Sequence, residues 1–275
     1  MCRLLAWAGR EPLTVQRALG DSDLEAFTAL SRQHADGWGM AWWPQPGLTE
    51  DGAPLTERST RCAADDPRFA ELTTTAAGDS GFVHLRWATH GLAIVPANTH
   101  PFTHGLLAFA HNGAIHPQER WDEILPAGWM SQMRGTTDSE RYFLAIVAQL
   151  EDGVPTRDAV ASVVHHLFAD LQPTSLNAML LTPDALFVIS AHDPMRAPAV
   201  SMSSGGASSS TEPDTAFYDL HYRARANSIV VASSGFPQPA GHGWAPLENM
   251  KLLRIERGSL ATSVSSLESP AQTRA

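Results

Sequence analysis

Apolar residues gather in short runs along the chain, and the pattern of these runs predicts mostly β-strands. Strand-like runs, rich in branched and aromatic side chains, occur at residues 4–8, 81–91, 106–111, 176–182, 185–191, 228–233 and 250–257. A further stretch, residues 34–43, has two glycines around a tryptophan followed by an aromatic run, which predicts a turn leading into a strand. Pro183-Asp184 separates two of the runs, so residues 176–191 are expected to form a hairpin.

Three stretches have helical spacing instead. Asp66-Pro67 is typical of a helix cap followed by proline at the first helical position, and it predicts a short helix through Leu72. Thr137-Asp138-Ser139-Glu140 has the form of a capping box, and the residues that follow it are apolar at helical spacing: Phe143, Ile146, Val147 and Leu150. After a break at 153–155, a further helix is expected from about Thr156, packed antiparallel to its predecessor.

The order of these elements constrains the architecture. Helices are too few to alternate with every strand, which argues against a doubly wound sheet and for two antiparallel sheets packed face to face with helices outside. We expect an α+β fold with a single domain over residues 1–267. Residues 195–214 are rich in Ser and Gly and are expected to form a flexible insertion, and 268–275 a disordered tail.

Composition narrows the functional classes. The 275 residues include 29 acidic and 19 basic side chains, a formal charge of −10, and no basic cluster interrupts that balance. Nucleic acids and anionic membranes are therefore not expected as partners. The apolar start ends at Arg10-Glu11-Pro12, too early for a signal peptide, and no apolar run reaches membrane-spanning length. Two cysteines, Cys2 and Cys62, make no disulfide framework, so a cytoplasmic location is expected, with Cys62 exposed.

Cys2 is the first candidate for chemistry. Removal of Met1 would place a thiol and an α-amine on one residue, and an α-amine has a pKa of about 7.7 to 8.0, low enough to act as a base near neutral pH. A simpler interpretation is a small buried thiol at the start of a strand. Position alone does not decide between the two.

Further candidates lie at the ends of the predicted strands. Arg86, in an apolar strand, needs either a buried ion pair or a pocket that receives an anion. Asn112-Gly113 is typical of a tight hairpin turn, yet the Asn112 amide and the Gly113 N–H could also be oxyanion donors. Asp138 either stabilises the start of its helix or binds a cation.

Four sequence motifs occur in a characteristic order along the chain. They are Cys2, then Arg86-Trp87-Ala88-Thr89-His90-Gly91, then His111-Asn112-Gly113, then Thr137-Asp138-Ser139-Glu140. Together they resemble the class II glutamine amidotransferases, whose domain is a four-layer αββα sandwich of the N-terminal-nucleophile hydrolase type. The resemblance implies that Cys2 attacks a γ-amide through a γ-glutamyl thioester, and that Asn112 and Gly113 hold the oxyanion. It further implies that Arg86 binds the substrate α-carboxylate, Asp138 the α-ammonium, and that Trp87, Thr89 and His90 line the pocket.

The expected function is hydrolysis of glutamine or a γ-glutamyl amide by a stand-alone member without a cofactor or metal. The product would be glutamate with either an amine or ammonia for a separate ammonia-using enzyme. Alternatives left open are a hydrolase of γ-glutamyl conjugates of the ergothioneine-pathway type, and a non-catalytic protein that binds a γ-glutamyl metabolite. A Cys–His mechanism could use His84, His90 or His111. A metallohydrolase would need His100, His104, His111 and His116, which lack a helical pair and an accompanying carboxylate motif.

Overall fold

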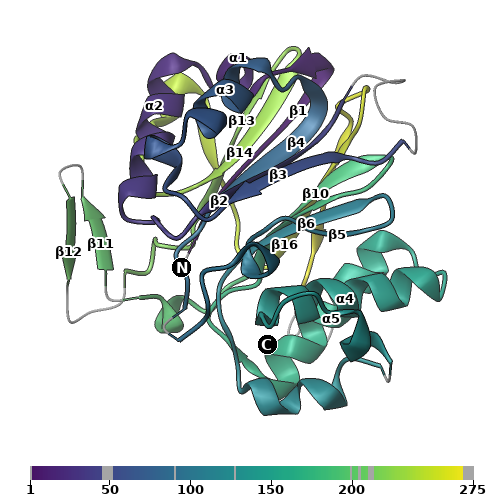
Figure 1. Ribbon diagram of the computed structural model, residues 1–275. Helices are drawn as coiled ribbons and strands as arrows, with labels where there is room; N and C mark the ends of the chain where they lie inside the picture. The colour runs from purple at the N-terminus through teal and green to yellow at the C-terminus, as the bar shows by residue number, and fades with distance from the viewer. Residues whose placement is uncertain are drawn as a thin grey trace.

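Two large antiparallel sheets lie face to face in the computed structural model, which describes residues 2–44, 52–89, 91–126, 128–198, 200–203, 206–209 and 214–268 (Figure 1). The first sheet has the order β15 (Trp244–Leu247), β13 (Leu220–Arg225), β14 (Ser228–Ser233), β1 (Arg3–Leu13), β4 (Gly78–Leu85), β2 (Trp38–Trp43) and β3 (Leu55–Ser59). The second has the order β17 (Thr262–Ser266), β16 (Lys251–Glu256), β10 (Ala185–Ser190), β9 (Asn177–Leu181), β6 (Leu107–Asn112) and β5 (Phe102–His104). Strand β1, which follows Cys2, is therefore central.

Helices cover the outer face of each sheet (Figure 1). The first sheet is covered by α1 (Val15–Leu19), α2 (Asp21–Ala29) and α3 (Pro67–Thr75), and the second by α4 (Asp138–Glu151) and α5 (Thr156–Asp170). Small antiparallel pairs are formed by β7 (Ile115–His116) with β8 (Gln172–Pro173), and by β11 (Val200–Ser203) with β12 (Gly206–Ser209). Short 3₁₀ helices are η1 (Leu30–Arg32), η2 (Ala63–Asp65), η3 (Pro96–Asn98), η4 (Gln118–Glu123), η5 (Trp129–Gln132), η6 (Pro194–Arg196) and η7 (Ala240–His242).

Small side chains fill much of the space between the sheets. Alternate residues of β1 face this inner core, where alanines of β6 and larger side chains of the neighbouring strands also gather. The buried members include Leu4, Ala6, Ala8, Ala41, Phe82, Ala108, Ala110, Met179, Val188 and Val231. Alanine at facing positions lets the two central strands approach closely. The starts and ends of these strands, including Cys2 and Asn112, can therefore come into contact.

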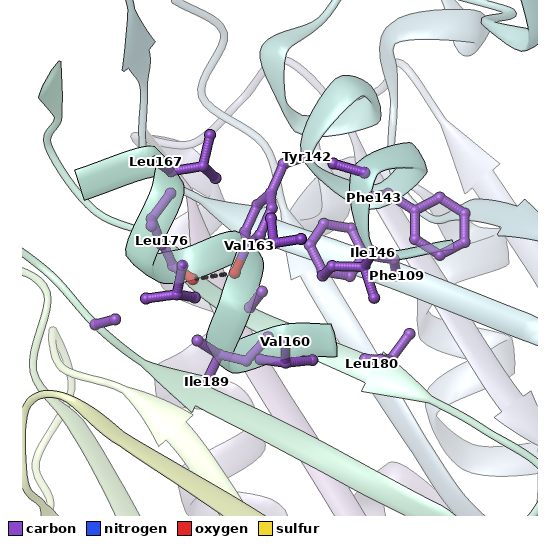
Figure 2. Close-up of a cluster of buried hydrophobic side chains, with 14 of the residues drawn as sticks. Phe109, Tyr142, Phe143, Ile146, Val160, Val163, Leu167, Leu176, Leu180 and Ile189 are labelled. Carbon is purple, nitrogen blue, oxygen red and sulfur yellow. Dashed lines mark hydrogen bonds between the residues drawn. The ribbon is translucent and has the colours of Figure 1, made fainter. Parts of the chain in front are cut away.

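A second core joins α4 and α5 to the outer face of the second sheet. Figure 2 shows its central members, among them Phe109 on β6, which stacks on Phe143 of α4 with ring centroids 5.3 Å apart. The Tyr142 hydroxyl donates to the Leu176 carbonyl at 3.4 Å, the bond drawn dashed in Figure 2. Burial raises the pKa of Tyr142 far above its ordinary value, so this hydroxyl stays neutral. The contacts fix α4, and with it Asp138, against the sheet that carries Asn112.

Most of the predicted elements are confirmed. Two antiparallel sheets with helices outside, the hairpin of β9 and β10, and the helices α3, α4 and α5 are all present. Asp66 caps α3 by accepting from the Arg68 N–H at 3.1 Å, and Thr137 caps α4 by accepting from the Glu140 N–H at 3.1 Å. Each of these helices has a local cap and enough apolar residues on one face to be recognised from sequence.

Several expectations are wrong. The capping box is incomplete, because the Glu140 carboxylate accepts from the Arg134 and Gly135 amides, both at 2.8 Å, rather than reaching the amide of the cap residue. The run at 81–91 forms a strand only to Leu85. Cys62 is half-buried against Ser31, whose carbonyl lies 3.3 Å from its Sγ, rather than exposed. The region between β1 and β2 holds α1 and α2, which sequence reasoning missed.

Two predicted segments are only partly open to comparison. Within residues 195–214, the strands β11 and β12 pair with each other, whereas residues 199, 204–205 and 210–213 lie outside the described residues. Nearly all of the predicted tail, residues 269–275, also lies outside them. Among the described helices, none is long and apolar enough to cross a bilayer.

Two histidine rings, tilted by 42° to each other, lie in contact in the interior close to β1. His84 of β4 faces the space between the sheets, two residues after Phe82, and its ring centroid lies 4.0 Å from that of His100. The loop that carries His100 passes directly over β2, because a Cβ at Gly39 would overlap the His100 carbonyl oxygen. Burial holds the pKa of both histidines well below the ordinary value of 6.5, and the nearby Arg86 lowers it further. Both rings are therefore neutral at pH 7.

We expect this pair to make the fold sensitive to mild acid. Unfolded histidine takes up a proton below about pH 6.5, whereas the buried rings resist it, so stability is full above that pH and is lost as the pH falls below it. Each histidine contributes a slope approaching about 1.4 kcal/mol per pH unit. Urea titrations of the parent and of His100→Leu, between about pH 5 and pH 7.5, should show a shallower pH slope in the variant. If the free energy of unfolding had the same pH dependence in both proteins, His100 would not be the source of the acid sensitivity, whatever the variant's absolute stability.

Candidate active site

Cys2 meets Asn112 where the two sheets come together. The Cys2 backbone N–H donates to Asn112 Oδ1 at 2.8 Å, and the Cys2 Sγ lies 3.7 Å from the Trp87 carbonyl oxygen. Cys2 is 8% exposed, and the chain end lies beside the ends of both sheets in Figure 1. With Met1 attached this nitrogen is a peptide amide, and it occupies the place that the α-amine would have after Met1 is removed.

The orientation of the Asn112 amide follows from this contact. Its oxygen must face Cys2, because only the oxygen can accept from an N–H, and its Nδ2 must therefore point the other way. Within the described residues, this buried Nδ2 has no hydrogen-bond partner. A buried amide nitrogen without a partner costs free energy, and such exceptions require an explanation. A ligand oxygen at this position would complete its hydrogen bonding.

The Asn-Gly dipeptide does not make the hairpin turn that its sequence is typical of. After Asn112 the chain leaves the sheet, and β7 pairs with β8 rather than turning back along β6. The Ala114 N–H donates to Thr174 Oγ1 at 3.0 Å, and a Cβ at Gly113 would overlap the Ser175 carbonyl oxygen. Glycine is required here by the close approach of the neighbouring backbone. The hairpin interpretation is wrong.

His111 supports this turn from behind. Its Nε2 lies 2.9 Å from the Ser175 carbonyl oxygen, which can only accept, so Nε2 carries the proton. Its Nδ1 then accepts from Ser139 Oγ at 2.9 Å, at the start of α4. Burial lowers the pKa of His111, and the nearby Asp138 carboxylate acts in the opposite direction. His111 thus joins the segment under Gly113 to the helix that bears Asp138, and it points away from the space between the sheets.

Both oxygens of Asp138 are held by backbone amides. Oδ2 accepts from the Ile115 N–H at 2.7 Å, and Oδ1 accepts from the Ser139 N–H at 2.8 Å. Asp138 is 6% exposed, and its carboxylate is fixed in orientation relative to the turn after Asn112. Each oxygen retains a second lone pair, so the same group can also accept from an ammonium. Helix stabilisation and cation binding, the two interpretations of the sequence, are compatible here.

Arg86 lies immediately after β4, beside the Cys2 end of β1. The register pairs Arg3 with Leu85, so Cys2 and Arg86 are the next positions along the two strands. The Arg86 guanidinium donates to the Asp36 and Ala93 carbonyl oxygens, both at 3.3 Å, and no carboxylate forms an ion pair with it in the part of the chain that is described. Burial lowers its pKa, and the nearby Cys2 and Asp36 side chains oppose that shift. The buried ion pair that the sequence allowed is not observed among the described residues, and backbone carbonyl oxygens take the place of a carboxylate.

The other members of the 86–91 motif have different surroundings. Trp87 is half-buried, and its ring meets His34 edge-on at 5.4 Å while its carbonyl oxygen faces Cys2. Thr89 is half-buried, and His90 lies outside the described residues. Asp36 Oδ2 accepts from the Ala88 N–H at 2.8 Å and so shapes the loop. Asp36 belongs to the stretch 34–43, for which the sequence predicts a turn, and the sequence left open whether Asp36 is a turn residue or lines a pocket.

A buried arginine that sequence reasoning missed fixes a further loop behind Cys2. Arg3 is fully buried, and its Nη1 donates to the Phe217 carbonyl oxygen at 2.7 Å while its guanidinium lies 3.9 Å from the centre of the Phe217 ring. Burial lowers its pKa to about 10, so it keeps its charge at neutral pH. Tyr218, which follows Phe217, makes two hydrogen bonds in the same loop. Its backbone carbonyl oxygen accepts from Asn177 Nδ2 at 2.6 Å, and its hydroxyl donates to Thr174 Oγ1 at 3.0 Å. Arg3 is thereby connected through this loop to Thr174, which accepts from the residue after Gly113.

The described residues offer little for the Cys–His mechanism or for a metallohydrolase. No histidine nitrogen is hydrogen-bonded to the Cys2 thiol within the described residues. His104 pairs instead with Glu151 at 2.8 Å, and His116 is exposed on β7. Among the residues described, no group of three or more His, Cys, Asp or Glu side chains has an arrangement that could hold a metal ion.

Comparison with known sequences identifies one family. The sequence profile of the class-II glutamine amidotransferases matches residues 1–268. Similar curated proteins include the probable glutamine amidotransferase DUG3 of Saccharomyces cerevisiae, 27% identical over 55% of this chain and 46% of that protein. A glutamine–fructose-6-phosphate aminotransferase of Caulobacter vibrioides is 28% identical over 61% of this chain and 25% of that protein. The matched stretch thus spans less than half the length of these relatives.

Solved structures share the fold. A glutamine aminotransferase class-II domain protein from Silicibacter pomeroyi superposes with a TM-score of 0.61 at 18% identity, covering 96% of this chain and 99% of the other. The glutamine phosphoribosylpyrophosphate amidotransferase of B. subtilis superposes with a TM-score of 0.63 at 16% identity, covering 97% of this chain and 49% of the other. At such identities the likeness concerns the fold, and it confirms the expected sandwich of two antiparallel sheets.

We expect the turn at Gly113 to tolerate no side chain. In Gly113→Ala the new Cβ would meet the backbone at Ser175, which is held by His111 and cannot yield cheaply, so the free energy of unfolding should fall by about 1–3 kcal/mol. Gly241→Ala is the matched control, because a Cβ at that position would have no heavy atom within 4 Å. Urea unfolding of the two variants measures the difference. Equal stabilities would show that the turn is not packed as described.

Proposed function

Because the chain belongs to the class-II glutamine amidotransferases, we propose that it hydrolyses the γ-amide of glutamine, or of a simple γ-glutamyl amide, with Cys2 as an N-terminal nucleophile. The observation that carries this proposal is the orientation of Asn112. One amide holds the nitrogen of Cys2 through its oxygen and keeps its own Nδ2 free for a substrate oxygen. A purely structural asparagine would have both ends paired.

The proposed reaction begins with removal of Met1. The free α-amine of Cys2 takes the thiol proton, and the sulfur attacks the γ-carbonyl carbon. Asn112 Nδ2 and the Gly113 N–H donate to the oxyanion that forms. The C–N bond then breaks as the protonated α-amine gives its proton to the leaving nitrogen, so a γ-glutamyl thioester and ammonia or an amine result. Water, deprotonated by the same α-amine, hydrolyses the thioester to glutamate and restores the thiol.

The substrate's zwitterionic end is assigned to two fixed charges. Arg86 is proposed to bind the α-carboxylate, since its guanidinium has only carbonyl partners at 3.3 Å in the described structure. Asp138 is proposed to bind the α-ammonium with the lone pairs that its amide partners leave. Trp87, Thr89 and His90 would line this end of the pocket. When glutamine is the substrate, the ammonia could pass to a separate enzyme.

Cys2 should be labelled only after Met1 is lost. With a diazoketone analogue of glutamine, intact-mass analysis should show a protein lighter by one methionine and carrying a single adduct, because the free α-amine activates the adjacent thiol. Cys62→Ser should be labelled equally, and Cys2→Ser should carry no adduct. An unprocessed and unlabelled amino terminus would contradict the mechanism.

Asn112→Ala should act mainly on turnover. Loss of one oxyanion donor typically lowers kcat by about 10²- to 10³-fold, whereas KM for glutamine should change little. Steady-state release of glutamate measures both parameters. Asn227→Ala, at the opposite end of the first sheet, is the control and should retain parental kinetics. An unchanged kcat in Asn112→Ala would remove Asn112 from the oxyanion site.

Arg86→Gln should act mainly on substrate binding. Leaving the carboxylate of the substrate without its buried partner costs about 2 kcal/mol or more, so KM for glutamine should rise by roughly 30-fold or more. Arg61→Gln, at an exposed residue in the bend between β3 and η2, is the control and should leave KM unchanged. A parental KM in Arg86→Gln would show that another group binds the carboxylate.

A further inference from the structure

Asp36, in the turn before β2, makes three hydrogen bonds to the segment that follows β4. Its N–H donates to the Arg86 carbonyl oxygen at 3.0 Å, and its own carbonyl oxygen accepts from Arg86 Nη1 at 3.3 Å. Its Oδ2 accepts from the Ala88 N–H at 2.8 Å. Asp36 therefore holds the residues on both sides of Trp87, the residue whose carbonyl oxygen faces the Cys2 thiol.

The turn that carries Asp36 is itself fixed in place. Gly37 has a φ of 130°, and a Cβ there would overlap a backbone carbonyl oxygen of β3, so the chain passes closely against that strand. The Gly37 carbonyl oxygen accepts from the Arg86 N–H at 2.8 Å. His34, which is buried, meets the Trp87 ring edge-on with ring centroids 5.4 Å apart. Backbone and ring contacts together set the position of Asp36 relative to the segment after β4.

A single peptide group connects the Asp36 carboxylate to the Cys2 thiol. The bond between Trp87 and Ala88 is trans, so its C=O and its N–H point to opposite sides. On one side the N–H donates to Asp36 Oδ2 at 2.8 Å. On the other side the C=O accepts from Cys2 Sγ at 3.7 Å. The carboxylate, the peptide and the thiol thus form one continuous series of hydrogen bonds.

The carboxylate at one end of this series strengthens the hydrogen bond at the other end. Hydrogen bonds to an ionised acceptor are roughly twice as strong as those between neutral groups. Because the carboxylate attracts the N–H proton, it leaves more electron density on the carbonyl oxygen of the same peptide, and linked hydrogen bonds strengthen one another by about 10–30%. A thiol is a weak donor, so its direction depends on the strength of its acceptor.

We propose that Asp36 is a positioning residue, which orients the Cys2 thiol through the Trp87–Ala88 peptide and fixes Arg86 through its main chain. This role rests on the proposed function, in which Cys2 attacks the γ-carbonyl carbon and Arg86 binds the α-carboxylate of the same substrate. A displacement of about 1 Å between such groups can lower the rate by about 10²-fold. Asp36 is linked to both groups and so keeps the distance between them constant.

Labelling of Cys2 by a diazoketone analogue of glutamine tests this role. The Cys62→Ser background makes Cys2 the only thiol of the chain. Asp36→Ala should slow the labelling by about 10-fold or more, because the thiol and Arg86 lose their orientation. Asp36→Asn keeps an oxygen for the Ala88 N–H but no charge, so its rate should be intermediate. Iodoacetamide, which needs no bound geometry, should label the parent and both variants at similar rates.

Asp79→Ala is the matched control. Asp79 lies near the opposite end of β4, is half-buried, and pairs with Arg257 at 2.8 Å, so its replacement removes fixed contacts far from Cys2. This variant should react with both reagents at the parental rates. If Asp36→Ala slowed both reagents by the same factor, or neither, Asp36 would only support the fold and the proposal would be overturned.

The S–H stretching band of Cys2 gives a readout that needs no turnover. A thiol that donates to a weaker acceptor absorbs at a higher frequency, so in the Cys62→Ser background the infrared band should shift upward in Asp36→Asn and further in Asp36→Ala. Asp79→Ala should leave the band unchanged. An unshifted band in both Asp36 variants would overturn the proposal. A shifted band in a protein whose Cys2 the analogue does not label would support the contact of Asp36 with the thiol and contradict the hydrolase function, so the two failures are distinguishable.

Discussion

The hydrogen bond from the Cys2 nitrogen to Asn112 Oδ1 joins the two sheets at the point on which the candidate chemistry depends. Cys2 precedes the central strand of one sheet, and Asn112 ends an inner strand of the other. Their meeting requires that the sheets approach closely, which the alanines of β1 and β6 allow. A larger side chain at Ala6 or Ala110 would act on the candidate site from within the core, without touching it.

Stability and site geometry rest on the same polar network around this bond. Arg3, Tyr218 and Thr174 connect the first sheet to the turn at Gly113, while His111 and Asp138 connect that turn to α4. These groups are almost all buried, where an unpaired polar atom costs about 1–3 kcal/mol. The network is therefore nearly complete, and its exceptions are informative. Asn112 Nδ2 and the Nε and Nη2 atoms of Arg3 have no hydrogen-bond partner among the described residues. Only the first of these is proposed to donate to the substrate.

The sequence predicts the helices and strands whose caps and apolar residues lie within one continuous stretch of the chain. Helix α4 has its cap and its apolar stripe within one continuous stretch, so it is recognisable, as are the buried strands β1, β6, β9 and β10. Helices α1 and α2 escape recognition because they are short and bury few residues, and the edge strand β3 because it is largely exposed. The edge strand β17 is exposed in the same way.

For the site, residue types were predictable and their partners were not. The Asn-Gly signal favours a hairpin locally, but Ser175 and Thr174, some 60 residues away, determine the path of the chain instead. Arg3 gives no signal, because its partner Phe217 lies 214 residues further along the chain. Three of the four motifs behind the family resemblance are in direct contact, because Cys2 touches both Trp87 and Asn112.

Buried polar groups with directed hydrogen bonds close the space between the sheets at the Cys2 end. The rest of that space is filled by closely packed apolar side chains, and such packing yields little to a change of side-chain volume. Cys2 and Asn112 lie at the ends of strands that pack on this core. A change of core volume would therefore move the two atoms of their hydrogen bond, so the packing of the sandwich and the geometry of the candidate site cannot vary independently.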